Sequence, residues 1–147
     1  MPKIHKYENI DEIEREAKKD LIDRHSPFVN CKGVAIRGVP FKVTVVVGDK
    51  YSHPDDLDHY ISSISLFNKE TKLAEMTYFA GTNGGQGKKA NSSVTFSIIL
   101  EKDAKLVAHA YCTKHGIWEG IPRDIKVVET VEEREALFNI KIPVDEV

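Results

Sequence analysis

The segment that most constrains the fold is an alternating run that ends in a cysteine. Leu106, Ala108, Ala110 and Cys112 occupy every second position, so their side chains share one face of a β-strand. A largely apolar face of this kind must be covered by a second layer of structure. The run therefore predicts a strand of a layered β fold, with the Cys112 thiol on the core side where the strand ends.

Strand signals recur along most of the chain. Residues 41–47 alternate with period two, and short apolar runs between turn residues mark further strands over 34–36, 61–67, 73–79, 94–100 and 125–128. About seven short strands separated by turn signals are typical of an antiparallel β-sandwich of the immunoglobulin-like type. The predicted fold class is therefore all-β.

Helical signals are confined to the two ends of the chain. Asn9 and Glu12 have capping-box spacing and apolar residues follow at helical steps, so we expect an N-terminal helix over roughly 10–22. Thr130 and Glu133 repeat that spacing near the C-terminus. Within one domain, the chain divides into an N-terminal helical extension over 1–22, a β-sandwich over 23–128 and a C-terminal extension over 129–147.

Composition excludes several classes of protein. A net charge of −2 argues against nucleic-acid binding, which usually requires a basic domain. No stretch approaches the ~20 apolar residues of a membrane span, and the N-terminus has no apolar signal region. The two cysteines allow at most one disulfide, which a reducing compartment disfavours. We therefore expect a cytoplasmic protein with no membrane partner.

Five potential metal ligands stand on predicted loops or at the ends of predicted elements: His25, His53, His59, Cys112 and His115. Four imidazoles and a thiolate exceed the four ligands of a structural zinc site. Nitrogen and sulfur donors in this number suit a five-coordinate transition metal. We therefore expect one metal site, with iron as the best match.

The same segments resemble the iron-ligand segments of the superoxide reductases, the neelaredoxin and desulfoferrodoxin family. The order of the segments, the six-residue step between His53 and His59, and the three-residue step between Cys112 and His115 all match. The resemblance runs from about Asp23 to about Glu119. Family members with a separate small iron domain carry four extra cysteines, so this chain resembles the single-iron form.

The resemblance implies the same sandwich fold and one mononuclear non-haem iron per chain. The four histidines would surround the iron in a plane, Cys112 would be the axial ligand, and the sixth position would be open. Superoxide would be reduced there by one electron and released as hydrogen peroxide. The family further implies rubredoxin or a similar small redox protein as electron donor, and a homo-oligomer, with a tetramer as one form.

One departure from the family concerns the pair of charges before the first histidine. The family has glutamate and lysine, whereas this chain has Asp23 and Arg24. The resemblance implies that Arg24 attracts superoxide and that Asp23 binds the oxidised iron, although aspartate is one methylene shorter. Arginine also differs from lysine in bulk and in its fixed charge. Other candidate cations are Lys50, Lys88, Lys89 and Lys114.

Two alternative functions stay open from the residues alone. A blue-copper electron carrier also uses a cysteine and histidines, but it usually needs an axial methionine, and the chain has only Met1 and Met76. A non-catalytic binding module stapled by a metal would have every ligand position filled. The glycine-rich segment 81–89 lacks the pattern of a phosphate-binding P-loop and is expected to be a loop.

The remaining chemically versatile side chains are expected to be structural. His5 and His109 are predicted to be ordinary surface or core histidines, since His109 lies on the opposite strand face from Cys112 and His5 precedes the first helix. Cys31 is expected to be a small buried hydrophobe. Trp118 is expected to be an aromatic of the core or of the wall of the site.

Overall fold

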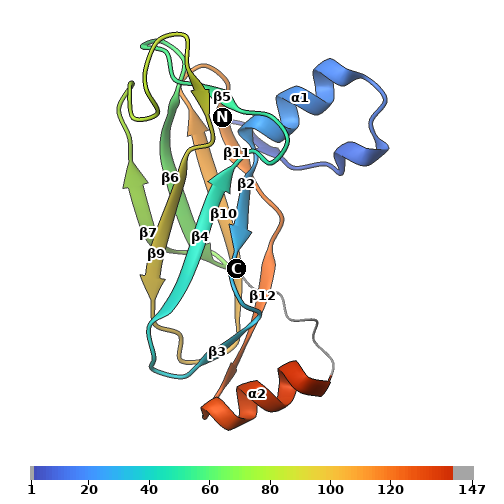
Figure 1. Ribbon diagram of the computed structural model, residues 1–147, viewed down its shortest axis with the longest axis vertical. Helices are drawn as coiled ribbons and strands as arrows, with labels where there is room; N and C mark the ends of the chain where they lie inside the picture. Colours follow the sequence, from blue (N-terminus) through green and yellow to red (C-terminus); the bar gives the residue numbers. More distant parts are fainter. Residues whose placement is uncertain (1, 141–147) are drawn as a thin grey trace.

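The computed structural model describes residues 2–140 as a sandwich of two β-sheets packed face to face, with a helix near each end (Figure 1). The predicted all-β sandwich with an N-terminal helix is therefore confirmed. A separate two-stranded sheet pairs β5 (His53–Pro54) with β8 (Lys89–Ala90). The long axis of the molecule runs along the strands, so the loops gather at two opposite ends. This arrangement separates the end beside α1 (Glu16–His25) from the end beside α2 (Val131–Ile140).

The larger sheet is built around β10 (Ala104–Cys112). One edge of β10 pairs with β6 (Ile61–Asn68), and the other edge is shared end to end by β12 (Arg123–Val128) and β11 (Gly116–Glu119). The other strands of this sheet are β7 (Thr71–Thr77), β1 (Ile4–Lys6) and β3 (Val34–Ile36). The β1–β11 and β12–β3 pairs are parallel, and the other pairs are antiparallel.

The smaller sheet has β4 (Phe41–Val47) between β2 (Pro27–Asn30) and β9 (Ser93–Ile98). Alternate residues of β4 and β10 are buried against one another, as their period-two patterns predict. The inward residues of the two strands are Phe41, Val43, Val45, Val47, Ala104, Leu106, Ala108, Ala110 and Cys112. Cys112 is thus the last core residue of β10, at the end of the sandwich beside α1.

The expected helix over 10–22 is instead two elements. The Asn9 side chain accepts a hydrogen bond from the backbone N–H of Asp11 at 3.0 Å and starts a short 3-10 turn, η1 (Ile10–Glu12). The chain becomes extended at Ile13, which packs on a small cluster beside Ile22. α1 then runs to His25, further than the pattern predicted. The extra turn matters because it places His25 at the end of a helix.

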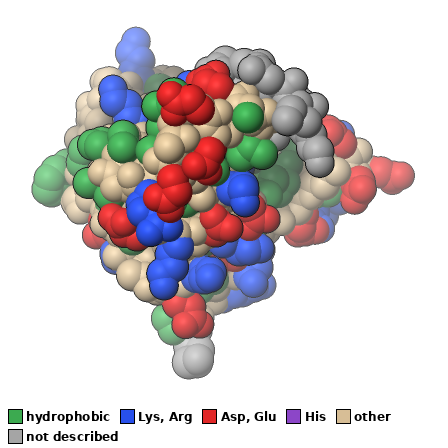
Figure 2. Space-filling view, turned by 90° about the horizontal axis from the view of Figure 1, so that it is seen from below, with side chains coloured by type: hydrophobic (Ala, Val, Ile, Leu, Met, Phe, Trp, Pro, Cys, Tyr) green, Lys and Arg blue, Asp and Glu red, His purple; other side chains and the backbone are tan. Residues whose placement is uncertain are grey.

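The expected cap at Thr130 is confirmed. The Thr130 hydroxyl accepts a hydrogen bond from the backbone N–H of Glu133 at 3.1 Å and begins α2. Figure 2 views the molecule from this end, where charges of both signs intermix over the described residues and no histidine shows. No described helix has the length and hydrophobicity to cross a membrane.

Candidate metal centre

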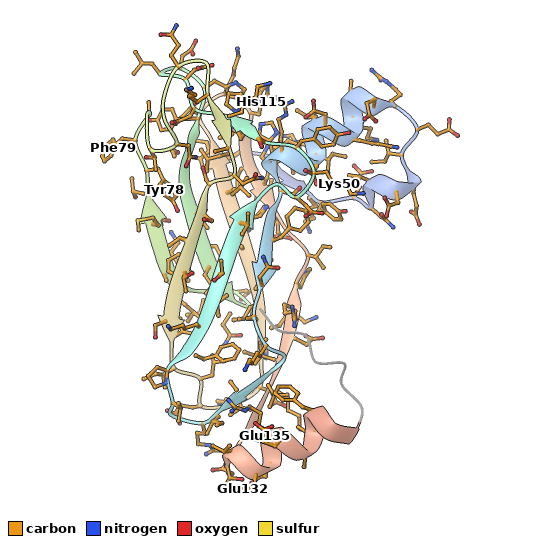
Figure 3. The ribbon with its side chains drawn as sticks, viewed as in Figure 1. Lys50, Tyr78, Phe79, His115, Glu132 and Glu135 are labelled. Atoms are coloured by element: carbon orange, nitrogen blue, oxygen red, sulfur yellow. The ribbon has the colours of Figure 1, made fainter. Side chains whose placement is uncertain are left out.

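The five candidate ligands meet at the end of the sandwich beside α1, where Figure 3 labels His115. They come from four separate segments. His25 ends α1, His53 belongs to β5 (His53–Pro54), and His59 closes a turn with Asp56. Cys112 ends β10, and His115 lies in the hairpin turn between β10 and β11.

The four imidazole rings form a closed square in the order His25, His53, His59, His115. Neighbouring ring centroids are 4.7–4.9 Å apart, and neighbouring ring planes are inclined by 68–82°. Across one diagonal, the rings of His25 and His59 are nearly parallel, at 23° and 6.2 Å. Each ring is therefore turned edge-on to the next, around a common centre.

The sulfur of Cys112 lies close to the axis of this square. Sγ is 3.3 Å from Nε2 of His53 and 3.8 Å from Nδ1 of His115, two rings at opposite corners. The ligand atoms of His25, His53, His59 and Cys112 all lie within 4.8 Å of one another, and His115 is outside that tighter group. Nitrogen and sulfur atoms at this spacing form a candidate metal site.

Backbone carbonyl groups set the orientation of two rings. Nδ1 of His25 lies 2.7 Å from the Leu21 oxygen, and Nδ1 of His53 lies 2.7 Å from the Pro54 oxygen. A carbonyl can only accept, so each Nδ1 carries the proton and Nε2 carries a free lone pair. Nε2 of His25 and of His59 is buried without a hydrogen-bond partner among the described residues. Such atoms are rare unless something else binds them, which fits a metal.

The environment of Cys112 both shields and tunes its sulfur. Burial raises the pKa of the Cys112 thiol, and backbone N–H groups of Lys114 and His115 that bond to the sulfur act to lower it. Gly116, directly opposite Cys112 in the hairpin, has a φ of +82°, which favours glycine. The hairpin thus presents a buried sulfur that is hydrogen-bonded from the backbone.

The glycine-rich loop, residues 81–89, forms a cradle of backbone N–H groups around the carboxylate of Asp55. Backbone N–H groups of Asn83 and Gly85 donate to Oδ2 of Asp55 at 2.7 and 3.0 Å, and that of Gly81 donates to Oδ1 at 3.0 Å. The two glycines have positive φ values, 96° at Gly81 and 85° at Gly85. Since Asp55 follows His53 by two residues, this cradle anchors the segment that carries a candidate ligand.

Asp23 anchors a second ligand segment in a similar way. Its Oδ2 accepts hydrogen bonds from the backbone N–H groups of Asp49, Lys50 and Tyr51 at 2.8–3.0 Å. Its Oδ1 is buried without a hydrogen-bond partner in the described chain. The carboxylate therefore ties the end of α1 to the loop that leads into His53.

Two cations act on the site. Burial lowers the pKa of His59 and of His115, and the charges of Lys114 and then Arg24 lower both pKa values further. Arg24 makes a two-point ion pair with Asp20, which neutralises part of its charge. Lys114 is exposed and precedes His115 directly. The predicted electrostatic residue is thus accompanied by a second cation.

The sequence patterns gave no site role to Asp55 or His5, and they left Trp118 as an aromatic of the core or of the wall of the site. Trp118 is 5% exposed, and its ring stacks on that of His25 at 5.0 Å and on that of His5 at 4.5 Å. One sequence signal was available for Asp55. It lies two residues from His53, and the chain later supplies the glycine-rich segment 81–89, which was expected to be only a loop.

We expect the metal-free protein to lose stability as the pH falls below 6.5. Burial lowers the pKa of His25 to about 3 and that of His53 to about 4, from an ordinary value of 6.5. At a pH between the native and the ordinary pKa values, these histidines are protonated in the unfolded chain but not in the native state. Acid therefore favours unfolding. Each histidine should contribute about 1.4 kcal/mol per pH unit to the slope of the free energy of unfolding against pH. Denaturant unfolding at pH 7 and pH 5 measures the difference, and the double variant His25→Gln, His53→Gln should have a shallower slope. Equal stability of the unsubstituted protein at both pH values would contradict this expectation.

Comparison with known proteins agrees with this geometry. Residues 13–121 match the family model described as desulfoferrodoxin. A neelaredoxin of Megalodesulfovibrio gigas is 29% identical over 108 residues, which cover 66% of this chain and 83% of that protein. A superoxide reductase of Pyrococcus furiosus is 27% identical over 108 residues, 66% of this chain and 85% of that protein. The structure of a superoxide reductase (neelaredoxin) from Ignicoccus hospitalis matches with a TM-score of 0.65 and 26% identity, covering 85% of this chain and 95% of that one.

Proposed function

Because this chain belongs to the desulfoferrodoxin family, we propose that it is a superoxide reductase with a single non-haem iron. The proposed ligands are His25, His53, His59, His115 and Cys112. The observation that carries the proposal is the closed square of four imidazoles with a thiol sulfur near its axis. Relatives that share most of the matched region are named superoxide reductase or neelaredoxin.

The number of donors favours iron over zinc. Structural zinc sites are closed by four ligands, whereas this site offers four nitrogens and one sulfur. Five donors leave one position of a six-coordinate ion free for a small anion. When bound, the iron would supply the one electron that, with two protons, converts superoxide to hydrogen peroxide.

The chain's own groups would tune this reaction. A thiolate donates electron density to a bound metal, and the backbone N–H groups of Lys114 and His115 at the sulfur moderate that donation. The carbonyl groups of Leu21 and Pro54 hold the rings of His25 and His53 with Nε2 toward the centre. The cations Arg24 and Lys114 would attract superoxide, which is an anion.

The stoichiometry of the product tests the function directly. The reduced, iron-loaded protein should yield one hydrogen peroxide for each superoxide consumed. Dismutation would yield half as much peroxide, with dioxygen as the other product. Pulse radiolysis with a peroxide assay distinguishes the two, and the lower yield would refute the proposed reductase.

Removing the charge of Arg24 should slow the reaction with superoxide without removing the metal. For Arg24→Ala we expect a rate about tenfold lower at low ionic strength, because a local cation concentrates an anionic substrate. The loss should shrink as salt is added. Lys114→Ala provides the comparison at the second cation, and Lys102→Ala is a control in the turn before β10. An unchanged rate and salt dependence in Arg24→Ala would show that Arg24 does not steer the substrate.

The proposed role of Asp23 as a ligand of the oxidised iron depends on one atom. Oδ2 is held by three backbone N–H groups, so only Oδ1 remains for a metal. The contacts support the anchoring role of Asp23 more directly. Asp23→Asn should therefore change the stability of the metal-free protein, which the ligand role alone does not require.

The electron that the reaction consumes must come from a partner. We propose a rubredoxin or a similar small redox protein as this donor, and a homo-oligomer, with a tetramer as one form, as the assembly. The copper alternative needs an axial methionine. Met76 lies on β7 with 42% of its surface exposed, and Met1 lies outside the described residues.

A further inference from the structure

A column of three stacked rings links the N-terminal strand to the candidate metal centre. The ring of Trp118 lies between those of His5 and His25, at centroid distances of 4.5 and 5.0 Å and interplanar angles of 22° and 19°. His5 pairs with Trp118 in the register of β1 and β11, so the backbone ladder places the outer ring on the inner one. His5 is half-buried, while Trp118 and His25 are buried.

The ring column restrains a rotation of the His25 imidazole that its contact with the Leu21 oxygen still permits. The contact of Nδ1 with the Leu21 oxygen fixes one atom of the ring, but the ring can still turn about that contact. The flat face of Trp118 against the imidazole removes this rotation. Trp118 is itself held by packing on Ile10 and Ile22 and by the hydrogen bond from its Nε1–H to the His115 oxygen at 3.2 Å.

We propose that the ring column of His5, Trp118 and His25 makes the N-terminal strand part of the metal centre, where it fixes the His25 imidazole and so sets how tightly the ion is held. Trp118 is a positioning residue, and it touches two candidate ligands at once, His25 by stacking and His115 through its carbonyl. His5 acts through Trp118. Residues 4–6 precede the region 13–121 that matches the family model, so this outer support is contributed by the chain's own N-terminal strand.

The magnitude follows from known effects around metal ligands. Groups that orient a ligand typically change metal affinity by about 10–100-fold, so Trp118→Leu should lose affinity in this range. Trp118→Phe keeps a ring against His25 but cannot donate to the His115 carbonyl, so its loss should be smaller. One aromatic pair corresponds to about a fivefold effect, which is the loss expected for His5→Ala.

The test measures the affinity of the metal-free protein for Co²⁺ in competition with a chromophoric chelator. His5→Phe restores a ring that cannot bind metal, and it should recover the affinity that His5→Ala loses. His109→Ala is the matched control, because His109 also lies against an aromatic ring, that of Phe67 at 4.7 Å, on the outer side of β10. It should bind Co²⁺ like the unsubstituted protein.

Two results would overturn the inference. One is an unchanged affinity in His5→Ala, and the other is a His5→Phe variant as weak as His5→Ala. The His5 variants decide the question even if Trp118→Leu fails to fold. The inference rests on the metal centre of the proposed function, but different results would contradict the ring column and the metal centre. If the unsubstituted protein binds Co²⁺ without a thiolate-to-cobalt absorption band, the centre itself is wrong.

Discussion

Cys112→Ser is expected to abolish a charge-transfer band in the red region of the spectrum, which should make the oxidised, iron-loaded protein blue. That band requires a thiolate on the iron, and a serine hydroxyl is a far weaker donor than a thiolate. Removing groups that only orient a ligand already costs about 10–100-fold in affinity, so loss of the ligand itself should cost more than about 100-fold. Absorption spectra and metal analysis of the purified variant measure both effects.

Cys31→Ser is the matched control for this experiment. Cys31 and Cys112 are both buried in the same core cluster, at 1% and 0% exposure. Each substitution replaces a buried sulfur with a smaller, more polar hydroxyl and should cost about 1–3 kcal/mol of stability. Only the Cys112 variant should also lose the band. A Cys112→Ser protein that stays blue when oxidised would remove the thiolate from the proposed centre.

Asp55→Ala should be among the most destabilising single changes in the site. The substitution leaves the backbone N–H groups of Gly81, Asn83 and Gly85 without their acceptor. Hydrogen bonds to a charged group contribute about 1.5–3 kcal/mol each, so the three together set an upper range of about 4.5–9 kcal/mol. Because Gly81 is exposed and Asn83 and Gly85 are only half-buried, water can replace part of the lost acceptor, and a loss of about 3–5 kcal/mol is expected. The β5 segment should then lose its anchor and metal retention should fall. Denaturant unfolding and metal content measure the two effects.

Asp56→Ala serves as the comparison for Asp55→Ala. The neighbouring carboxylate accepts one hydrogen bond, from the Gly87 N–H at 3.2 Å, in an exposed position. Its removal should cost about 1 kcal/mol. If the two variants are equally stable, the cradle does not hold the loop. The comparison separates the effect of the cradle from that of negative charge beside the site.

The strand patterns and the C-terminal cap were predictable because local rules decide them. In β4 and β10 a period-two pattern faces a single apolar layer, so local alternation and tertiary burial demand the same register. The side chain of Thr130 caps α2 within four residues of sequence. In the same way, alternation was sufficient to place Cys112 on the core side of its strand.

Features that depend on distant partners were not predictable. The expected helix is interrupted at Ile13, whose extended backbone accompanies packing of its side chain on the cluster of Ile10, Ile22 and Trp118. The helical periodicity does not reveal this contact. The parallel pairing of β1 with β11 joins segments more than a hundred residues apart, and with it comes the stacking of His5 on Trp118. The glycine-rich segment 81–89 was expected to be only a loop, because its hydrogen bonds to Asp55 join residues 26–30 positions apart.

The ligand segments belong to both layers of the sandwich. His25 leads into β2 and His53 follows β4, strands of the smaller sheet, whereas His59 leads into β6 and Cys112 ends β10 in the larger one. An ion bound by all four would cross-link the two layers, as an inter-sheet disulfide does in other sandwiches. The layers could then separate at this end only after the ion departs. The residence time of the metal and the lifetime of the native state should therefore lengthen together.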